Sequence, residues 1–162
     1  MNETAYNKWT IAHPNPRGTG SALRLCLFPA DETAQGHVSA TFGKQTTCGE
    51  VYAGGWNPPE FDWLDAVTVK LRSEELAEIL RVLRGEQESI ADGKGIFHRT
   101  AKANAVIKFS HVIEPCPGYL FSVSQKPFDG DLREAFIVLR PNEALMLSCV
   151  IEHIFASIIF GV

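Results

Sequence analysis

Hydrophobic and polar positions alternate along several short segments of the chain, a pattern that predicts β-strands. The alternation is clearest at residues 21–28, where leucines alternate with Arg24 and Cys26. Three more segments in the first half of the chain predict strands in the same way: residues 8–13, 36–45 and 65–71. A helix with one apolar face is predicted to follow, from a cap at Ser73 to Gly85.

The second half of the chain repeats this order of elements. Alternation predicts strands at residues 97–100, 105–113, 119–126 and 134–139. A longer helix is predicted at residues 142–160, with apolar side chains on nearly all of its sides. Because such a helix must be covered on all sides, we expect it at the interface of a homo-oligomer, a dimer or a tetramer.

Three sequence matches in the same order indicate an internal duplication. The matched positions are 23–25 with 107–109, Gly36 and Lys44 with Gly118 and Lys126, and 71–75 with 139–143. Their separations are 84, 82 and 68 positions, so the first repeat is predicted to carry 14 additional residues within residues 46–59.

The predicted fold is therefore α+β, with two ββββα repeats in a single domain over residues 1–162. The first repeat covers about residues 6–85, a charged linker covers residues 86–94, and the second repeat covers about residues 95–162. Each repeat is expected to form an antiparallel sheet, and the two sheets pack with the two helices.

The net charge of the chain is negative, but the charge of individual segments differs in sign. The formal net charge of −4 over 162 residues argues against a protein that coats nucleic acid by bulk charge. Residues 93–113 carry +4 and residues 1–27 carry +2, whereas residues 49–92 carry −6. The strands are thus basic and the insertion and first helix are acidic, so nucleic-acid binding, if present, is expected on the sheets.

Other kinds of site have little support in the sequence. The four cysteines have no C-x-x-C spacing, so no metal site, cofactor or disulfide framework is predicted. The five histidines fall in different elements without a catalytic spacing, so we expect no enzyme. Residues 1–20 lack an apolar signal segment, and Glu152 and His153 interrupt the apolar stretch at 144–162. We therefore expect a cytoplasmic protein that does not bind a membrane.

Basic and aromatic residues on or beside the strands are the candidate binding residues. The candidate phosphate ligands are Arg17, Arg24, Lys44, Lys102, Lys108 and Lys126. The candidate base-stacking residues are Trp9, Phe42, Trp56 and Phe97. Single-strand binding requires both chemistries. The alternative, which composition alone favours, is that the charges form an ordinary solvated face and the aromatics lie in the core. Trp56 has a similar alternative, which is to hold its own loop against the sheet.

Several short segments carry a resemblance to a known family. Residues 17–23, Arg-Gly-Thr-Gly-Ser-Ala-Leu, approximate a Lys-Gly-Lys-Ala-Ala-Leu signature. Residues 61–63, Phe-Asp-Trp, are similar to a Tyr-Asp-Trp motif before a fourth strand, and Phe97-His98 to a Phe-His motif after a first helix. Glu114-Pro115 precedes an aromatic strand, as in the same family. With the order of elements, these segments resemble the Whirly family of single-stranded-DNA-binding proteins.

The resemblance implies two ββββα repeats, tetramers, and sequence-tolerant binding of single strands across the sheets. The related Pur-alpha-like proteins point to the same ligand class. Three departures stand out: Thr19 replaces the second lysine of the signature, Gly20 is additional, and residues 46–59 are not part of the family pattern.

The first expectation is therefore a homo-oligomeric, non-enzymatic protein that binds single-stranded DNA or RNA. Transcription regulation is one expected process, and repair and replication are left open. The alternative is a protein-interaction or assembly module of the same fold without nucleic-acid binding. A third possibility is small-ligand binding in a groove between the sheets and the insertion.

Overall fold

The computed structural model describes residues 7–162, and the first half of the chain forms an antiparallel sheet followed by a helix. Sheet 1 has the strand order β1-β2-β3-β6. Its strands are β1 (Lys8–His13), β2 (Ser21–Phe28), β3 (His37–Gln45) and β6 (Phe61–Leu71). Helix α1 (Ser73–Leu83) follows β6, and the short 3-10 helix η1 (Ile90–Gly93) leads into the second half.

The second half repeats this arrangement. Sheet 2 has the order β7-β8-β9-β10. Its strands are β7 (Ile96–Arg99), β8 (Ala103–Val112), β9 (Gly118–Pro127) and β10 (Arg133–Leu139), and helix α2 (Pro141–Phe160) follows. Both sheets are antiparallel and each leads into a helix, so the predicted α+β fold of two ββββα repeats is confirmed.

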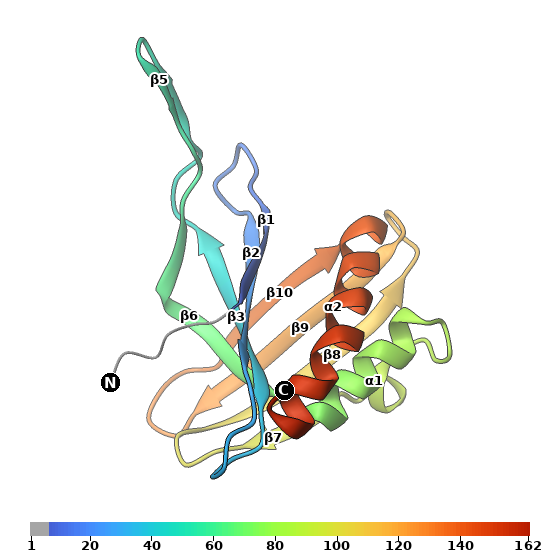
Figure 1. Cartoon of the computed structure of the whole chain (residues 1–162). Coiled ribbons are helices and arrows are strands. Elements are labelled where there is room, and N and C mark those ends of the chain that lie inside the picture. The colour runs from blue at the N-terminus through green and yellow to red at the C-terminus, as the bar shows by residue number, and fades with distance from the viewer. Residues whose placement is uncertain (1–6) are drawn as a thin grey trace.

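One apolar core lies between the inner faces of the two sheets and the helices. Helices α1 and α2 lie side by side on sheet 2, and the strands of sheet 1 run across those of sheet 2 (Figure 1). The rings of Phe42 in β3 and Phe121 in β9 meet edge to face, with centroids 5.0 Å apart. Because only the inner face of each sheet is covered by this core, the two outer faces remain open to solvent.

Strand pairing defines which residues of the two repeats are equivalent. The central inner row of sheet 1 is Ile11, Leu23, Phe42 and Val67, and that of sheet 2 is Ile96, Ile107, Val123 and Ala135. These rows confirm separations of 84 for the second strands and 68 for the fourth, but they give 81 for the third.

The predicted match of Lys44 with Lys126 is therefore wrong by one residue. Adjacent residues of a strand face opposite sides of the sheet, so the two lysines do not occupy equivalent positions. The separations of 81 and 68 also mean that the first repeat has 13 additional residues and not 14.

Two histidine–glutamate contacts cross between the repeats. His13 at the end of β1 lies 2.8 Å from Glu143 of α2, and His98 of β7 lies 2.7 Å from Glu75 of α1. The rows above place His13 and His98 at equivalent positions, and each glutamate is the third residue of its helix. Each helix is therefore tied to the first strand of the other repeat.

The same two glutamates cap their helices. The backbone N–H of Arg72 donates to Glu75 at 2.9 Å, and that of Arg140 donates to Glu143 at 2.8 Å. The capping residues are Arg72 and Arg140, so the predicted cap at Ser73 is wrong. A glutamate that reaches back to the residue before the helix satisfies a free N–H group there without a serine.

Two ion pairs join residues that are themselves equivalent. Asp65 of β6 lies 3.0 Å from Arg133 of β10, and Arg84 lies 2.6 Å from Glu152 of α2, and each pair is separated by 68 positions. The hydrogen bond to Glu152 raises the pKa of the Arg84 guanidinium. A residue meets its own equivalent only near a two-fold axis, so the repeats are related by an approximate two-fold axis that passes close to both pairs.

The insertion in the first repeat forms a hairpin. Strands β4 (Glu50–Tyr52) and β5 (Gly55–Asn57) pair with each other and project away from the rest of the molecule (Figure 1). The strand after the insertion, β6, begins at Phe61 and not at residue 65 as predicted. Its pairing with β3 shifts between Phe42 and Lys44, where two steps along β3 face five steps along β6, so this irregularity takes up three of the additional residues.

Helix α2 buries one side only. Its buried residues face the sheets and α1, whereas a second apolar set is exposed: Leu145, Met146, Ile159 and Phe160. By length and composition α2 could also span a membrane. A soluble oligomer remains our prediction, because Glu152 in the middle of the helix forms an ion pair with Arg84.

We expect Glu75→Ala to lower the free energy of unfolding by about 1–3 kcal/mol, since it removes a cap and leaves His98 without its partner. Glu78→Ala, on the same helix in an exposed ion pair with Arg81, should cost at most about 0.5 kcal/mol. Urea denaturation followed by circular dichroism measures both. Equal stability of the two variants would show that the crossed contact does not hold the repeats together.

Candidate nucleic-acid interface

One row of side chains crosses the outer face of sheet 2 near its β7–β8 turn. Arg99 of β7 pairs with Asn104 of β8, which pairs with Lys126 of β9. Strands lie about 4.8 Å apart, so this row spans about 10 Å. Lys126 donates a hydrogen bond to the carbonyl of Gly130, while the buried Oδ1 of Asn104 has no hydrogen-bond partner among residues 7–162. The row offers two cations with an amide between them.

Two exposed phenylalanines lie at opposite edges of the same face. Phe97 in edge strand β7 is 62% exposed and Phe136 in edge strand β10 is 61% exposed. Lys108 of β8 pairs with Ser122 of β9, which pairs with Phe136, so this lysine lies between the two edges. Within the described chain neither Lys108 nor Arg99 forms an ion pair. The face thus combines free cations with apolar rings that are open to solvent.

The outer face of sheet 1 holds its central cation differently. The guanidinium of Arg24 lies 3.8 Å from the centre of the Trp63 ring. Gly43 makes room for this ring, because a side chain there would begin 3.1 Å from it. Arg24 is only partly exposed and its Nε has no hydrogen-bond partner in the described structure. Trp63 therefore fixes the direction of Arg24 and leaves its charge available.

The loop that contains Arg17 is shaped by internal hydrogen bonds. The buried side chain of Gln45 accepts from the backbone N–H groups of Asn15 and Gly20, each at 2.9 Å. Any side chain at Gly20 would collide with the carbonyl of His13. The additional glycine in the signature-like segment is thus required by the fold of this loop, and Arg17 is exposed on it.

The structure separates the remaining predicted residues. Phe42 is 3% exposed in the core and cannot stack on a base, so that prediction is wrong. Trp9 packs inward against the core and is likewise not free on an outer face. Trp56 is 60% exposed on the hairpin, Lys102 lies in the β7–β8 turn, and Lys44 is exposed at the end of β3. Only Phe97, Lys108 and Lys126 share the outer face of sheet 2.

Sequence patterns missed Arg99 and Phe136 on this face. Arg99 could have been found from the alternation that also places Phe97, since the two residues are two apart on one strand. Phe136 could not, because both sides of β10 carry large apolar residues: Phe136 and Val138 outward, Ile137 and Leu139 inward.

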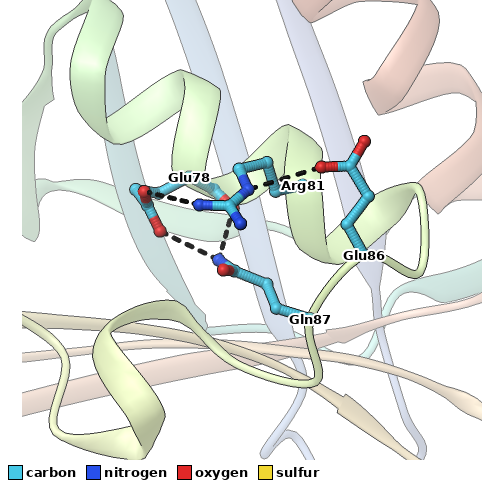
Figure 2. Close-up of polar contacts among 4 residues, drawn as sticks. All are labelled: Glu78, Arg81, Glu86 and Gln87. Carbon is cyan, nitrogen blue, oxygen red and sulfur yellow. Dashed lines mark hydrogen bonds and ion pairs between the residues drawn. The ribbon is translucent and has the colours of Figure 1, made fainter.

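The acidic residues of α1 are largely paired with neighbours. Figure 2 shows Arg81 between Glu78 and Glu86, at 3.5 and 3.4 Å, with Gln87 donating to Glu78 at 2.9 Å. These contacts fold the linker back onto the helix, and Arg81 is the only basic residue among them. No group of three or more metal-ligating side chains occurs within residues 7–162.

The two-repeat architecture with crossed sheets and adjacent helices is a Whirly-like fold. The chain is similar to the structure of the plant transcriptional regulator PBF-2, with a TM-score of 0.70 and 15% identity over 97% of this chain and 84% of that one. It is also similar to the crystal structure of WHY3 from Arabidopsis thaliana, with a TM-score of 0.66 and 15% identity over 94% of this chain and 88% of that one. For WHY1 from Arabidopsis thaliana the TM-score is 0.66 and the identity 16%, over 96% and 89%. No protein-family model and no curated protein matches the sequence.

We expect Phe42→Ala to lower the free energy of unfolding by about 3–5 kcal/mol, because it empties a site in the core. Phe136→Ala, on the exposed edge, should change it by no more than about 0.5 kcal/mol. Chemical denaturation of both variants is the measurement. A Phe42→Ala protein as stable as the Phe136→Ala protein would contradict the inward position of Phe42.

Proposed function

We propose that this protein binds single-stranded nucleic acid, with single-stranded DNA the preferred form, with little sequence preference and without catalysing a reaction. The observation that carries the proposal is the outer face of sheet 2, where Arg99, Lys108 and Lys126 form no ion pair within the described chain and share the face with the exposed rings of Phe97 and Phe136. Cations attract the phosphates, and exposed rings stack with bases that are not paired to a second strand.

The structural comparisons support the proposal of a nucleic-acid-binding protein. One protein of the same fold is described as a plant transcriptional regulator, so we propose transcription regulation as the process. Arg17, Arg24, Lys44, Lys102 and Trp56 remain proposed secondary contacts, since all five lie away from the core of the fold. Trp9 and Phe42 pack inward, so neither belongs to this interface.

A second candidate function is an assembly module without nucleic-acid binding, and its interaction surface is the set of apolar residues that α2 exposes. Leu145 is 65% exposed and Phe160 is 74% exposed. Apolar residues that gather on one helix mark an interaction surface. We propose that a second copy of the chain covers these residues, in a dimer or a tetramer, whether or not the protein binds nucleic acid. The two functions therefore differ only in whether the sheets bind a ligand.

Fluorescence anisotropy with labelled single-stranded and duplex oligonucleotides at two salt concentrations tests the proposed function. We expect tighter binding of the single strand, and an affinity that falls with salt by about 0.7 log units per log unit of salt for each phosphate contact. K108E/K126E should weaken binding at least about tenfold at low salt without changing the unfolding transition. An intact oligomer with no preference for the single strand would favour the assembly module.

Leu145→Glu should convert the oligomer into monomers, because it puts a charge on the surface that α2 shares with the second copy. Leu132→Glu is the matched control: Leu132 is 58% exposed but lies before β10, away from α2. Light scattering coupled to size exclusion gives the mass of each. If both variants keep the mass of the unmodified protein, α2 is not the interface.

A further inference from the structure

A basic groove of about 1040 Å³ lies where the edge of sheet 1 meets sheet 2. One wall is β6 with the start of α1, and the other is the β7–β8 turn with the end of β9. Four cations line it: Lys70, Arg72, Arg99 and Lys102. The cations of one wall are about 30 positions from those of the other in the sequence, so only the packing of the two repeats brings them together.

The charge of this groove is not cancelled within the protein. All four cations are exposed, and none forms an ion pair within residues 7–162. Two carboxylates also line the groove, Glu75 and Asp129. Glu75 already accepts hydrogen bonds from His98 and from the backbone of Arg72, which leaves Asp129 on the β9–β10 turn as the free acid. The groove therefore has an excess of positive charge.

Apolar rings accompany the cations. Phe97 and Phe128 both line the groove and are 62% and 54% exposed. Phe97 and Arg99 also belong to the outer face of sheet 2, because β7 is the edge strand between the two surfaces. The backbone of a flexible single strand can therefore pass around β7 from the outer face into the groove and remain close to cations along the whole path.

The equivalent groove in the other repeat shows that the fold alone does not produce this lining. That groove, of about 610 Å³, lies between β10 and the β1–β2 loop. Across the two-fold relation Lys70 corresponds to Val138, and Thr68 corresponds to Phe136. Its charged side chains outside the His13–Glu143 contact are one lysine and one glutamate, Lys44 and Glu134. The duplicated fold therefore contains two equivalent grooves, and only the groove beside β6 is lined with an excess of basic side chains.

We propose that the basic groove holds the sugar–phosphate backbone of a single strand that continues from the outer face of sheet 2, with Phe128 stacking on one of its bases. This inference rests on the proposed function. A single strand fits better than a duplex, because the duplex keeps its bases stacked inside and out of reach of Phe97 and Phe128. An acidic protein segment would use the cations but would leave both rings without a partner.

The test compares two doubly substituted proteins of equal charge. K70E/K102E changes only the basic groove, whereas K8E/K94E changes two exposed lysines outside it, one on edge strand β1 and one directly after η1. Binding of an oligothymidylate of about 20 nucleotides, longer than a typical single-strand site, is followed by anisotropy between about 50 and 200 mM salt.

We expect K70E/K102E to weaken binding at least about tenfold and to reduce the salt dependence by about 1.4 log units per log unit, two contacts at about 0.7 each. K8E/K94E should stay within about threefold of the unmodified protein. If charge reversal alters the unfolding transition, K70Q/K102Q takes its place and should still weaken binding about threefold. Unchanged binding by a folded groove variant overturns the inference but leaves the proposed function intact, whereas no single-strand binding by the unmodified protein removes both.

Phe128→Ala separates a nucleic acid from another polyanion. The loss of one base stack should weaken oligothymidylate binding about fivefold or more, while binding of an abasic strand of the same length should not change. Polyglutamate is the competitor of matched charge. If it displaces the oligonucleotide equally well, and Phe128→Ala binds oligothymidylate as the unmodified protein does, the groove takes an acidic protein segment and the inference is wrong.

Discussion

The structure depends on two crossed contacts, His13 with Glu143 and His98 with Glu75. Each glutamate accepts hydrogen bonds from two directions: one from the backbone before its helix, and one from a histidine in the first strand of the other repeat. Every helix start is thereby fixed to the opposite sheet, which sets how the two sheets cross. Since helices and core occupy only the inner faces, this crossing also leaves both outer faces free and creates a groove at each junction of the sheets.

The sequence predicts a large part of this architecture, because the duplication and the alternation of apolar residues are local patterns. The chain order of the strands in the two sheets, the two α-helices and the separations of 84 and 68 are correct, although β6 begins four residues earlier than predicted and the hairpin of β4 and β5 was not predicted. The third-strand match is wrong by one residue, and in a strand one residue decides between core and solvent. Phe42 and Phe97 show the consequence: both are aromatic residues in strands, yet one is 3% and the other 62% exposed. The basic groove was beyond local patterns, because Lys70 and Arg99 meet only through the packing of different repeats.

Two-fold symmetry explains the scaffold, and departures from it explain the candidate site. The contacts that hold the repeats together are symmetric: two crossed histidine–glutamate pairs, and the equivalent residues that meet near the axis, Asp65 with Arg133 and Arg84 with Glu152. The candidate ligand surfaces are not. Lys70 of the first repeat is equivalent to Val138 of the second, and Thr68 is equivalent to Phe136. The hairpin occurs in the first repeat only. A single strand has a direction, and a surface with two unlike halves can bind it in one orientation.

The net charge of −4 is a poor guide to binding because acids and bases are used differently in this fold. Glu75, Glu78, Glu86, Glu143 and Glu152 all contact a histidine or an arginine within the protein. Lys108, Lys126 and the four cations of the basic groove have no such partners among the described residues. These five carboxylates therefore act as structural groups, and their field is reduced by the side chains they contact. On the outer face of sheet 2 and in the groove beside it, the cations without an acidic partner leave a local excess of positive charge. A polyanion that approaches these two surfaces is therefore attracted.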